Sequence, residues 1–182
     1  IKIIVDLTSL NKLTNTNPFE RDYTIIDETE DFIVVLKKSG IAVQVTDKTL
    51  DDLESILNKR FGIPLHVLNR IDQPVTGLVI FGKNKTFSAE FTEMLKSRTV
   101  KKTYLAIVAG QPKKGKVELK HYLKKLHNRA MTADILVDHN YKEAILEYEL
   151  LQSFDNYHLL RIFLKTGRFH QIRAQLATME LP

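Results

Sequence analysis

The chain has 182 residues, of which 43% are hydrophobic, so it can bury one well-formed core and is short for two. Its 27 Lys and Arg residues exceed its 22 Asp and Glu residues, and the net charge of +5 is compatible with a polyanionic partner without establishing one. The absence of Cys excludes disulfides, zinc–thiolate sites and a thiol nucleophile. No apolar run approaches the roughly 18 residues of a membrane helix. Because the N-terminus also lacks a signal-peptide pattern, we expect a cytoplasmic protein.

Both ends of the chain have the pattern expected of a fragment. The chain starts at Ile1 without Met, and it stops at Pro182 while a helical pattern is still running. Residues 1–20 combine one apolar run with a polar stretch, and we expect an N-terminal extension to which no role can be assigned. Residues 21–182 are predicted to form a single domain that is truncated at its C-terminus.

The first regular elements of the chain are a strand and a helix. A β-branched run predicts a strand over residues 32–36, and Ser39-Gly40 predicts the turn after it. Leu and Ile side chains between residues 50 and 57 share one face of a predicted helix, which has acids in its first turn and ends at Gly62. This helix is expected to face the core, and nothing in it indicates a function.

The stretch from Pro64 to Lys83 is the centre of the chain. An apolar run leads to Arg70-Ile71-Asp72, a turn follows at Gln73-Pro74, and residues 78–81 form a predicted buried strand. A carboxylate that a rigid turn holds in place is a plausible group for chemistry. On residue types alone, a solvated pair or a turn-capping Asp is the stronger interpretation.

Two further elements follow this stretch. Residues 85–97 have an apolar stripe at helical spacing, which predicts a helix that faces the core. Residues 100–110 alternate as a strand, with Tyr104 on one face and Leu105 and Ile107 on the other, and we expect both faces to be largely buried.

The middle of the chain is basic. Residues 113–129 contain seven Lys and Arg residues and a single acid, Glu118, so most of the net charge lies here. A solvated face and a phosphate-binding surface are equally good interpretations of this segment. His121 and His127 lie six residues apart without a third ligand nearby, so no metal site is expected.

The last third of the chain returns to regular patterns. Residues 144–151 alternate as a half-exposed strand, and residues 159–164 form another strand. Thr166-Gly167 predicts a turn into a helix, with Arg168 at the helix start and Arg173 about one turn further on.

Three of these segments resemble, in order, motifs of the RluA-type pseudouridine synthases. Residues 70–78 are similar to that family's Arg-Leu-Asp-x-x-(Thr/Ser)-Gly-Leu, and residues 102–110 are similar to its Lys-x-Tyr-x-Ala-x-Val-x-Gly. Residues 164–173 resemble its Leu-x-Thr-Gly-Arg-x-His-Gln-Ile-Arg most specifically. The chain departs from the family at Asn69, where His is common, and at residues 37–40, which lack a Pro. With the early strand, the resemblance covers roughly residues 24–180.

The resemblance implies an isomerase that converts specific uridines of rRNA or tRNA to pseudouridine without a cofactor or a metal. Asp72 is then expected to be the catalytic nucleophile, and Tyr104 is expected to pack against the base and transfer a proton. Arg168, with Arg173 as second choice, is expected to pair with Asp72. The side chains expected to bind RNA are Arg70, Arg173, Lys102 and Lys165.

The implied reaction breaks the C1′–N1 bond, turns the uracil and rejoins it through C5, on a base that is flipped out or already unpaired. Asp72 can attack C1′ or take the 2′ proton towards a glycal, and the sequence leaves both paths open. The implied fold is α+β: one catalytic domain with a mixed, largely antiparallel sheet, flanking helices and an active-site cleft across the sheet. The alternative is a non-catalytic RNA-binding module on the same fold. A hydrolase that uses Asp72 would need a base or a second carboxylate at a defined spacing, which the chain does not show.

Overall fold

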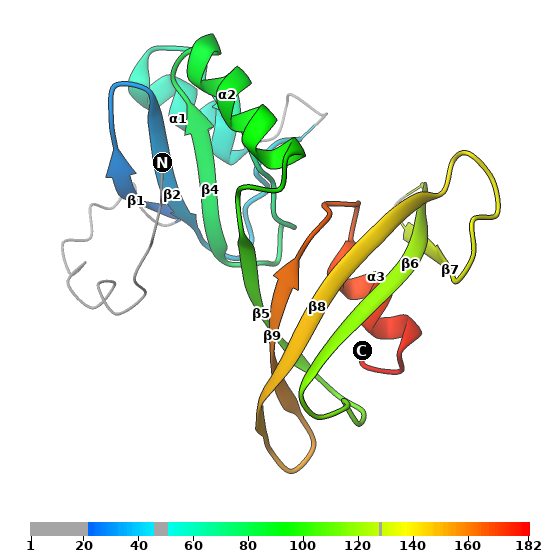
Figure 1. The fold of residues 1–182 in the computed structure, drawn as a ribbon. Helices are drawn as coiled ribbons and strands as arrows, with labels where there is room; N and C mark the ends of the chain where they lie inside the picture. Colours follow the sequence, from blue (N-terminus) through cyan, green and yellow to red (C-terminus); the bar gives the residue numbers. More distant parts are fainter. Residues whose placement is uncertain (1–21, 46–50, 128) are drawn as a thin grey trace. The chain divides into compact units, whose positions relative to one another are not determined.

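The computed structural model describes residues 22–45, 51–127 and 129–182, and the expected N-terminal extension lies outside them. Two compact units divide the chain, Ile1–Glu93 and Met94–Pro182. The elements, in chain order (Figure 1), are β1 (Tyr23–Glu28), β2 (Phe32–Lys37), α1 (Leu53–Phe61), β3 (His66–Val67), β4 (Gly77–Gly82), α2 (Lys85–Lys96), β5 (Lys102–Val108), β6 (Lys116–Leu126), β7 (Arg129–Ala133), β8 (Lys142–Ser153), β9 (His158–Leu164) and α3 (Gln171–Thr178).

The first unit contains a four-stranded antiparallel sheet with the strand order β1-β2-β4-β3. Its centre is β2, whose Ile and Val side chains favour extended backbone and fill both faces of the sheet. Ile33 and Val35 join the core to which α1 contributes Leu53 and Leu57. On the other face, Phe32 stacks on Phe87 of α2 with ring centroids 5.0 Å apart.

Local signals in the sequence set the ends of α1. The Asp52 carboxylate accepts a hydrogen bond from the Ser55 backbone N–H at 2.7 Å, and the Ser55 hydroxyl accepts one from the Asp52 N–H at 3.1 Å. This reciprocal capping box begins the helix. Gly62 ends it in the left-handed conformation, with φ +67°, which Gly adopts without steric cost. The predicted helix and its stop are therefore confirmed.

The second unit contains a five-stranded antiparallel sheet with the order β5-β9-β8-β6-β7. Alternation along β8 buries Ala144, Leu146 and Tyr148, as its sequence predicts. The helix α3 packs beside β6 and β7 (Figure 1), and it adds Leu176 to the core of this unit.

The expectation for β5 was half wrong. Tyr104 and Ala106 pack against the core, but Leu105 and Ile107 on the opposite face are 59% and 70% exposed. The apolar alternation of this strand resembles that of a strand buried on both faces. In the structure β5 ends the strand order and has one neighbour, β9.

The α+β class is confirmed. Among the strands that the structure describes, every pairing is antiparallel, and the strands form two sheets where one mixed sheet was expected. No helix within residues 22–45, 51–127 and 129–182 is long and apolar enough to cross a membrane.

Candidate functional site

Asp72 lies in the loop between β3 and β4. The Val75 N–H donates a hydrogen bond to the Asp72 carbonyl at 3.0 Å, which closes the predicted turn over Gln73 and Pro74. The Asp72 side chain is half-buried, whereas Arg70 on the same loop is exposed. The loop therefore carries a partly sheltered carboxylate next to an accessible guanidinium.

A buried lysine holds this loop against the turn after β2. Lys37 is fully buried, and its ammonium donates to the carbonyls of Lys38 and Ile41 at 2.8 Å and to that of Gln73 at 3.0 Å. Gly40 and Gln73 also exchange hydrogen bonds in both directions, at 3.0 Å from the Gly40 N–H and at 2.8 Å from the Gln73 Nε2. The residue that follows Asp72 is thus fixed from several sides.

The charges of Lys37 and Asp72 interact. Burial lowers the pKa of Lys37, because desolvation disfavours the ammonium, and the negative charge of Asp72 opposes this change. The Lys37 ammonium and the Asp72 carboxylate therefore interact electrostatically as well as through the hydrogen bond from Lys37 to the Gln73 carbonyl.

Asn69 holds the other end of the loop. The backbone pairing of β3 with β4 ends near Leu68, whose N–H donates to the Ile80 carbonyl at 3.0 Å. At Asn69 the side chain, in place of the backbone, forms hydrogen bonds with β4. Its Nδ2 donates to the Leu78 carbonyl at 3.0 Å, and its Oδ1 accepts from the Ile80 N–H at 2.8 Å. The carboxamide satisfies both backbone groups of β4, so the chain can leave the sheet towards Asp72.

Tyr104 and Lys102 lie on β5 in the second unit. Tyr104 pairs with Ile162 of β9, and its half-buried side chain packs against the core. Lys102, at the start of β5, pairs with Leu164 at the end of β9. It therefore lies next to the turn that follows β9, and a Cβ on Gly167 would be only 3.5 Å from its Nζ.

The side chain of Gln171 holds the turn from Thr166 to Arg168 in place through hydrogen bonds. Gln171 is buried, and its Oε1 accepts from the Thr166 hydroxyl at 2.8 Å and from the Arg168 N–H at 2.9 Å. The exposed Arg168 guanidinium is oriented by its own Nε, which donates to the Glu143 carbonyl at 2.9 Å. Arg168 thus has a defined backbone and a defined side-chain direction.

A buried network continues from Gln171 into the sheet. Its Nε2 donates to Gln175 at 2.9 Å, and Gln175, fully buried, is hydrogen-bonded to His121 Nδ1 at 3.0 Å. Gln175 also donates to the carbonyls of Leu119 and Ala144. His121 is consequently a buried hydrogen-bond partner within this network.

The helix begins later than the sequence suggests. Arg168 was expected at its start, but α3 begins at Gln171, because His170 adopts a left-handed conformation with φ +49°. The His170 carbonyl accepts the first helical hydrogen bond, from the Ala174 N–H at 2.9 Å. Arg173 becomes the third residue of the helix, and it is exposed.

The two lysines that were expected to bind RNA, Lys165 and Lys102, lie in surroundings of opposite charge. The Lys165 ammonium lies 2.7 Å from a Glu118 oxygen and 3.8 Å from a Glu147 oxygen, and hydrogen bonding to Glu118 raises the pKa of Lys165. Burial lowers the pKa of Lys102, and the charges of Arg168 and Arg98 lower it further. Lys165 is neutralised by carboxylates, whereas Lys102 lies among cations.

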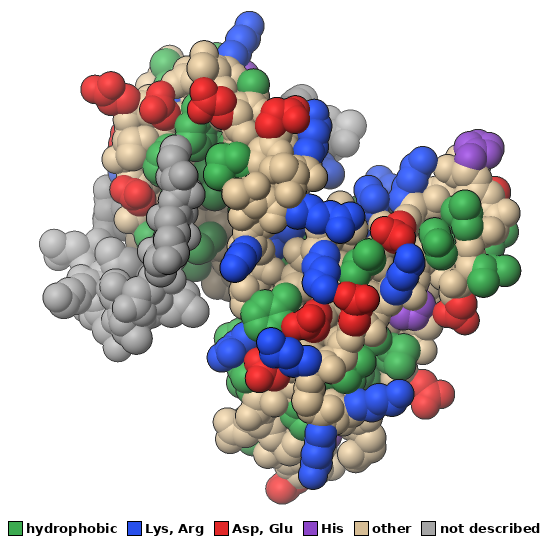
Figure 2. All heavy atoms as spheres, viewed as in Figure 1, with side chains coloured by type: hydrophobic (Ala, Val, Ile, Leu, Met, Phe, Trp, Pro, Cys, Tyr) green, Lys and Arg blue, Asp and Glu red, His purple; other side chains and the backbone are tan. Residues whose placement is uncertain are grey.

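Much of the basic segment is also paired. Lys120 lies 2.9 Å from Glu143, and Lys124 lies 3.4 Å from Asp138. Figure 2 shows acidic side chains among the Lys and Arg side chains of the second unit. These pairs favour a solvated, ion-paired face for at least this part of residues 113–129.

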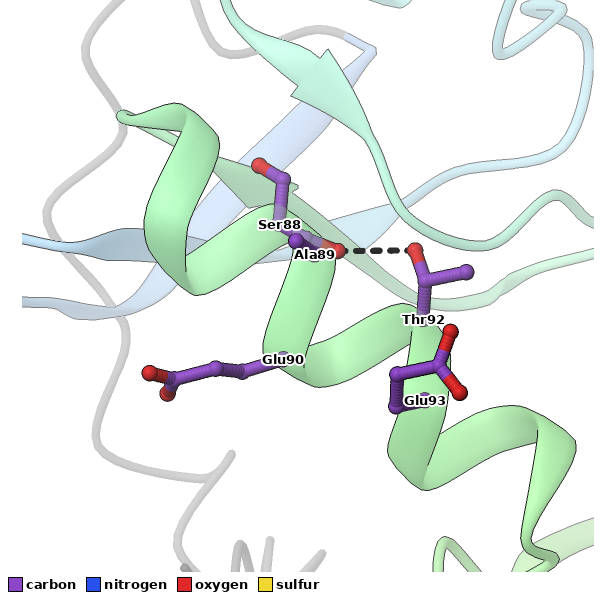
Figure 3. A pocket seen from close by; sticks show the side chains of 5 residues that line it. All are labelled: Ser88, Ala89, Glu90, Thr92 and Glu93. Atoms are coloured by element: carbon purple, nitrogen blue, oxygen red, sulfur yellow. Dashed lines mark hydrogen bonds between the residues drawn. The ribbon is translucent and has the colours of Figure 1, made fainter.

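A shallow hollow follows the exposed side of α2 (Figure 3). Its lining includes Glu90, Glu93 and Thr92, whose hydroxyl donates to the Ser88 carbonyl at 2.7 Å. Two carboxylates make this hollow unsuitable for a polyanion, and it contains none of the expected site residues. Within the part of the chain that the structure describes, no group of three His, Cys, Asp or Glu residues can hold a metal ion.

The structure therefore brings the expected residues together in two places. Asp72 and Arg70 share one loop of the first unit, and Lys102 and Arg168 lie at one end of the sheet in the second unit. Sequence reasoning missed the residues that hold these places, which are Lys37, Asn69 and Gln171. Lys37 had a signal, because it is in phase with the buried Ile33 and Val35 of its strand.

Comparison with known proteins defines the class. Residues 31–178 match the family model described as RNA pseudouridylate synthase. The chain therefore belongs to the RNA pseudouridylate synthase family, as its three motifs predict.

Several curated relatives carry matching names. The chain is 32% identical to the ribosomal large subunit pseudouridine synthase C of Rickettsia bellii, over 87% of this chain and 54% of that protein. It is 29% identical to the ribosomal large subunit pseudouridine synthase D of Buchnera aphidicola, over 97% of this chain and 58% of that protein. The chain thus spans little more than half the length of these relatives.

Two solved structures share the fold. Human RNA Pseudouridylate Synthase Domain Containing 1 matches with a TM-score of 0.74 at 20% identity, over 93% of this chain and 69% of that one. Human RNA Pseudouridylate Synthase Domain Containing 4 matches with a TM-score of 0.68 at 22% identity, over 91% of this chain and 67% of that one.

Proposed function

We propose that the protein is an RNA pseudouridine synthase, an isomerase that converts specific uridines of rRNA or tRNA to pseudouridine with Asp72 as the nucleophile. The observation that carries the proposal is the loop of Asp72, which Lys37 and Asn69 fix from both ends in a chain of this family. The names of the relatives, which refer to the ribosomal large subunit, favour rRNA over tRNA. Residues 21–182 act as the catalytic domain in this proposal.

The chemistry assigns a direct role to the Asp72 carboxylate. In the covalent path it attacks C1′ while the electrons of the C1′–N1 bond pass to the uracil. After the uracil turns, C5 attacks C1′ and displaces the carboxylate, then C5 loses its proton and N1 gains one. In the glycal path Asp72 instead removes the 2′ proton as the uracil leaves with the electrons of the C1′–N1 bond. After the uracil turns, C5 bonds to C1′ and Asp72 returns the proton to C2′, and C5 then loses its proton while N1 gains one. Both paths conserve all atoms and electrons, so neither requires an oxidant, a reductant or a group donor.

The remaining residues have supporting roles in the proposal. Tyr104 packs against the target base and transfers the proton, and Arg168 pairs with the Asp72 carboxylate, with Arg173 as the second candidate. Arg70 is exposed on the Asp72 loop, where its planar guanidinium can stack on bases and bind phosphate. Lys102 and Lys165 complete the RNA-binding set, and the lack of a carboxylate beside Lys102 favours it over Lys165.

The test is tritium release from RNA that carries tritium at C5 of its uridines, with an RNA-binding assay in parallel. We expect release by the wild type and none by Asp72→Asn, whose RNA affinity should stay within about twofold of wild type, because the substitution removes charge without changing size. Release by Asp72→Asn would refute the nucleophile assignment. RNA binding without release by the wild type would favour the non-catalytic RNA-binding module.

A further inference from the structure

Three cationic side chains gather at one end of the sheet in the second unit. Lys102 starts β5 next to the Thr166–Arg168 turn, and the electrostatic influence of both Arg98 and Arg168 reaches its ammonium. Arg98 lies just after α2, in a left-handed conformation with φ +58°. The charges of Arg98 and Arg168 also reach Glu143, so the three cations share one neighbourhood.

The described residues do not neutralise this cluster. Within them, neither the Arg98 guanidinium nor the Lys102 ammonium makes a hydrogen bond or an ion pair. Arg168 uses its Nε for the Glu143 carbonyl and keeps its two terminal nitrogens for another ligand. The Glu143 carboxylate is already bound by Lys120 at 2.9 Å.

Clustered cations repel one another unless an anion lies between them, and partial burial of Lys102 strengthens the repulsion. Lys165 follows Leu164, the residue of β9 that pairs with Lys102, and its charge is neutralised in the usual way, because two glutamates lie beside it. Glu143, the acid that the charges of Arg98 and Arg168 reach, is bound by Lys120, and Gly167 leaves the space next to the Lys102 ammonium free of a side chain.

We propose that Arg98 and Lys102, beside Arg168, form a binding site for one phosphate group of the RNA backbone. The inference rests on the proposed function, because an RNA substrate supplies the phosphodiester. Arg98 can bind two phosphate oxygens through its planar fork, and Lys102 adds a point charge. Arg168 flanks the site and remains available for a carboxylate.

The first experiment uses inorganic phosphate at constant ionic strength and follows the lysine side-chain signals of the 182-residue chain by NMR. We expect a saturable shift at Lys102, with its pKa rising towards that of an ordinary lysine, because the bound anion stabilises the ammonium. Arg98→Gln should weaken this binding several-fold. Lys124, which is paired with Asp138 at 3.4 Å, should not respond saturably.

The second experiment measures the affinity for a short single-stranded RNA as a function of salt concentration. Lys102→Met should make the slope of log K against log salt shallower by about 0.7, the value for one lost phosphate contact on a single strand. Lys124→Met, the same change at a lysine of this unit that is paired with Asp138 at 3.4 Å and lies outside the proposed RNA-binding set, should leave the slope nearly unchanged.

Two results would overturn the inference: a Lys102 signal that does not saturate with phosphate, or equal responses at Lys102 and Lys124. The phosphate titration involves no uridine chemistry. A chain that releases no tritium but binds phosphate at Lys102 would therefore contradict the proposed function and leave this site intact.

Discussion

The substitution Lys37→Met tests whether a buried ammonium holds the loop of Asp72. Met has nearly the length of Lys and no donor, so it removes the three hydrogen bonds to the carbonyls of Lys38, Ile41 and Gln73. The change leaves the side-chain volume nearly intact. Its effect therefore reports the loss of the donor and of the charge.

The expected loss of stability follows from the surroundings of the three acceptors. The bond to the Ile41 carbonyl is buried, and an acceptor left without a donor there costs about 1–3 kcal/mol. The bonds to Lys38 and Gln73 are partly buried, where water can replace the donor, at about 0.5–1.5 kcal/mol each. Relief from burying a charge offsets part of this sum, since desolvation lowers the pKa of Lys37. We expect a net loss of about 2–3 kcal/mol, or about 5–10 °C in Tm.

Thermal and urea unfolding measure this loss, and tritium release measures its effect on turnover. The matched control is Lys59→Met, which breaks an exposed pair with Asp51 at 3.4 Å and should cost less than about 0.5 kcal/mol. Turnover of Lys37→Met should fall even at temperatures where the variant is fully folded, because the carbonyl of Gln73, the residue after Asp72, no longer accepts a hydrogen bond from residue 37. A variant as stable and as active as wild type would refute the role assigned to Lys37.

Two further predictions concern the other side chains that hold the site. Asn69→Asp keeps the acceptor for the Ile80 N–H but places a carboxylate oxygen against the Leu78 carbonyl. It should lower turnover and reduce the free energy of unfolding, measured in urea, by about 1–3 kcal/mol. Unchanged turnover would show that the loop does not need these two hydrogen bonds. Gln171→Met removes the acceptor for the Thr166 hydroxyl and for the Arg168 N–H, and should lower turnover with a Tm loss of several degrees. Gln171→Glu keeps both acceptor contacts and should retain more turnover. Equal turnover of the two Gln171 variants would contradict the positioning role.

The sequence predicted the elements with strong local signals. The β-branched run of β2, the alternation of β8, and Gly62 after α1 each follow from the preferences of a few neighbouring residues. The motifs located the loop of Asp72 and the turn before Arg168. These parts could be predicted because their information lies within about ten consecutive residues.

The parts that failed depend on residues far apart in the chain. The exposure of Leu105 and Ile107 depends on which face of β5 packs against the core, and this face is the opposite one, with Tyr104 and Ala106, which no local pattern reveals. The late start of α3 depends on the left-handed His170 and on Gln171, which holds the preceding turn. The burial of Lys37 depends in part on Gln73, from a distant loop, whose carbonyl accepts its hydrogen bond.

The order of strands in the second sheet has a consequence for how the chain folds. The pairs β6–β7 and β8–β9 form between neighbouring segments and can close early, but β5 has its described partner in β9, at the far end of the unit. During synthesis β5 must wait, with its core-facing Tyr104 and Ala106 still exposed, until β9 has been made. The turn that carries Arg168 follows β9 directly, so it is made only after this long-range pairing has become possible. Conditions that delay that pairing should favour aggregation through β5 over assembly of the RNA-binding end of the sheet.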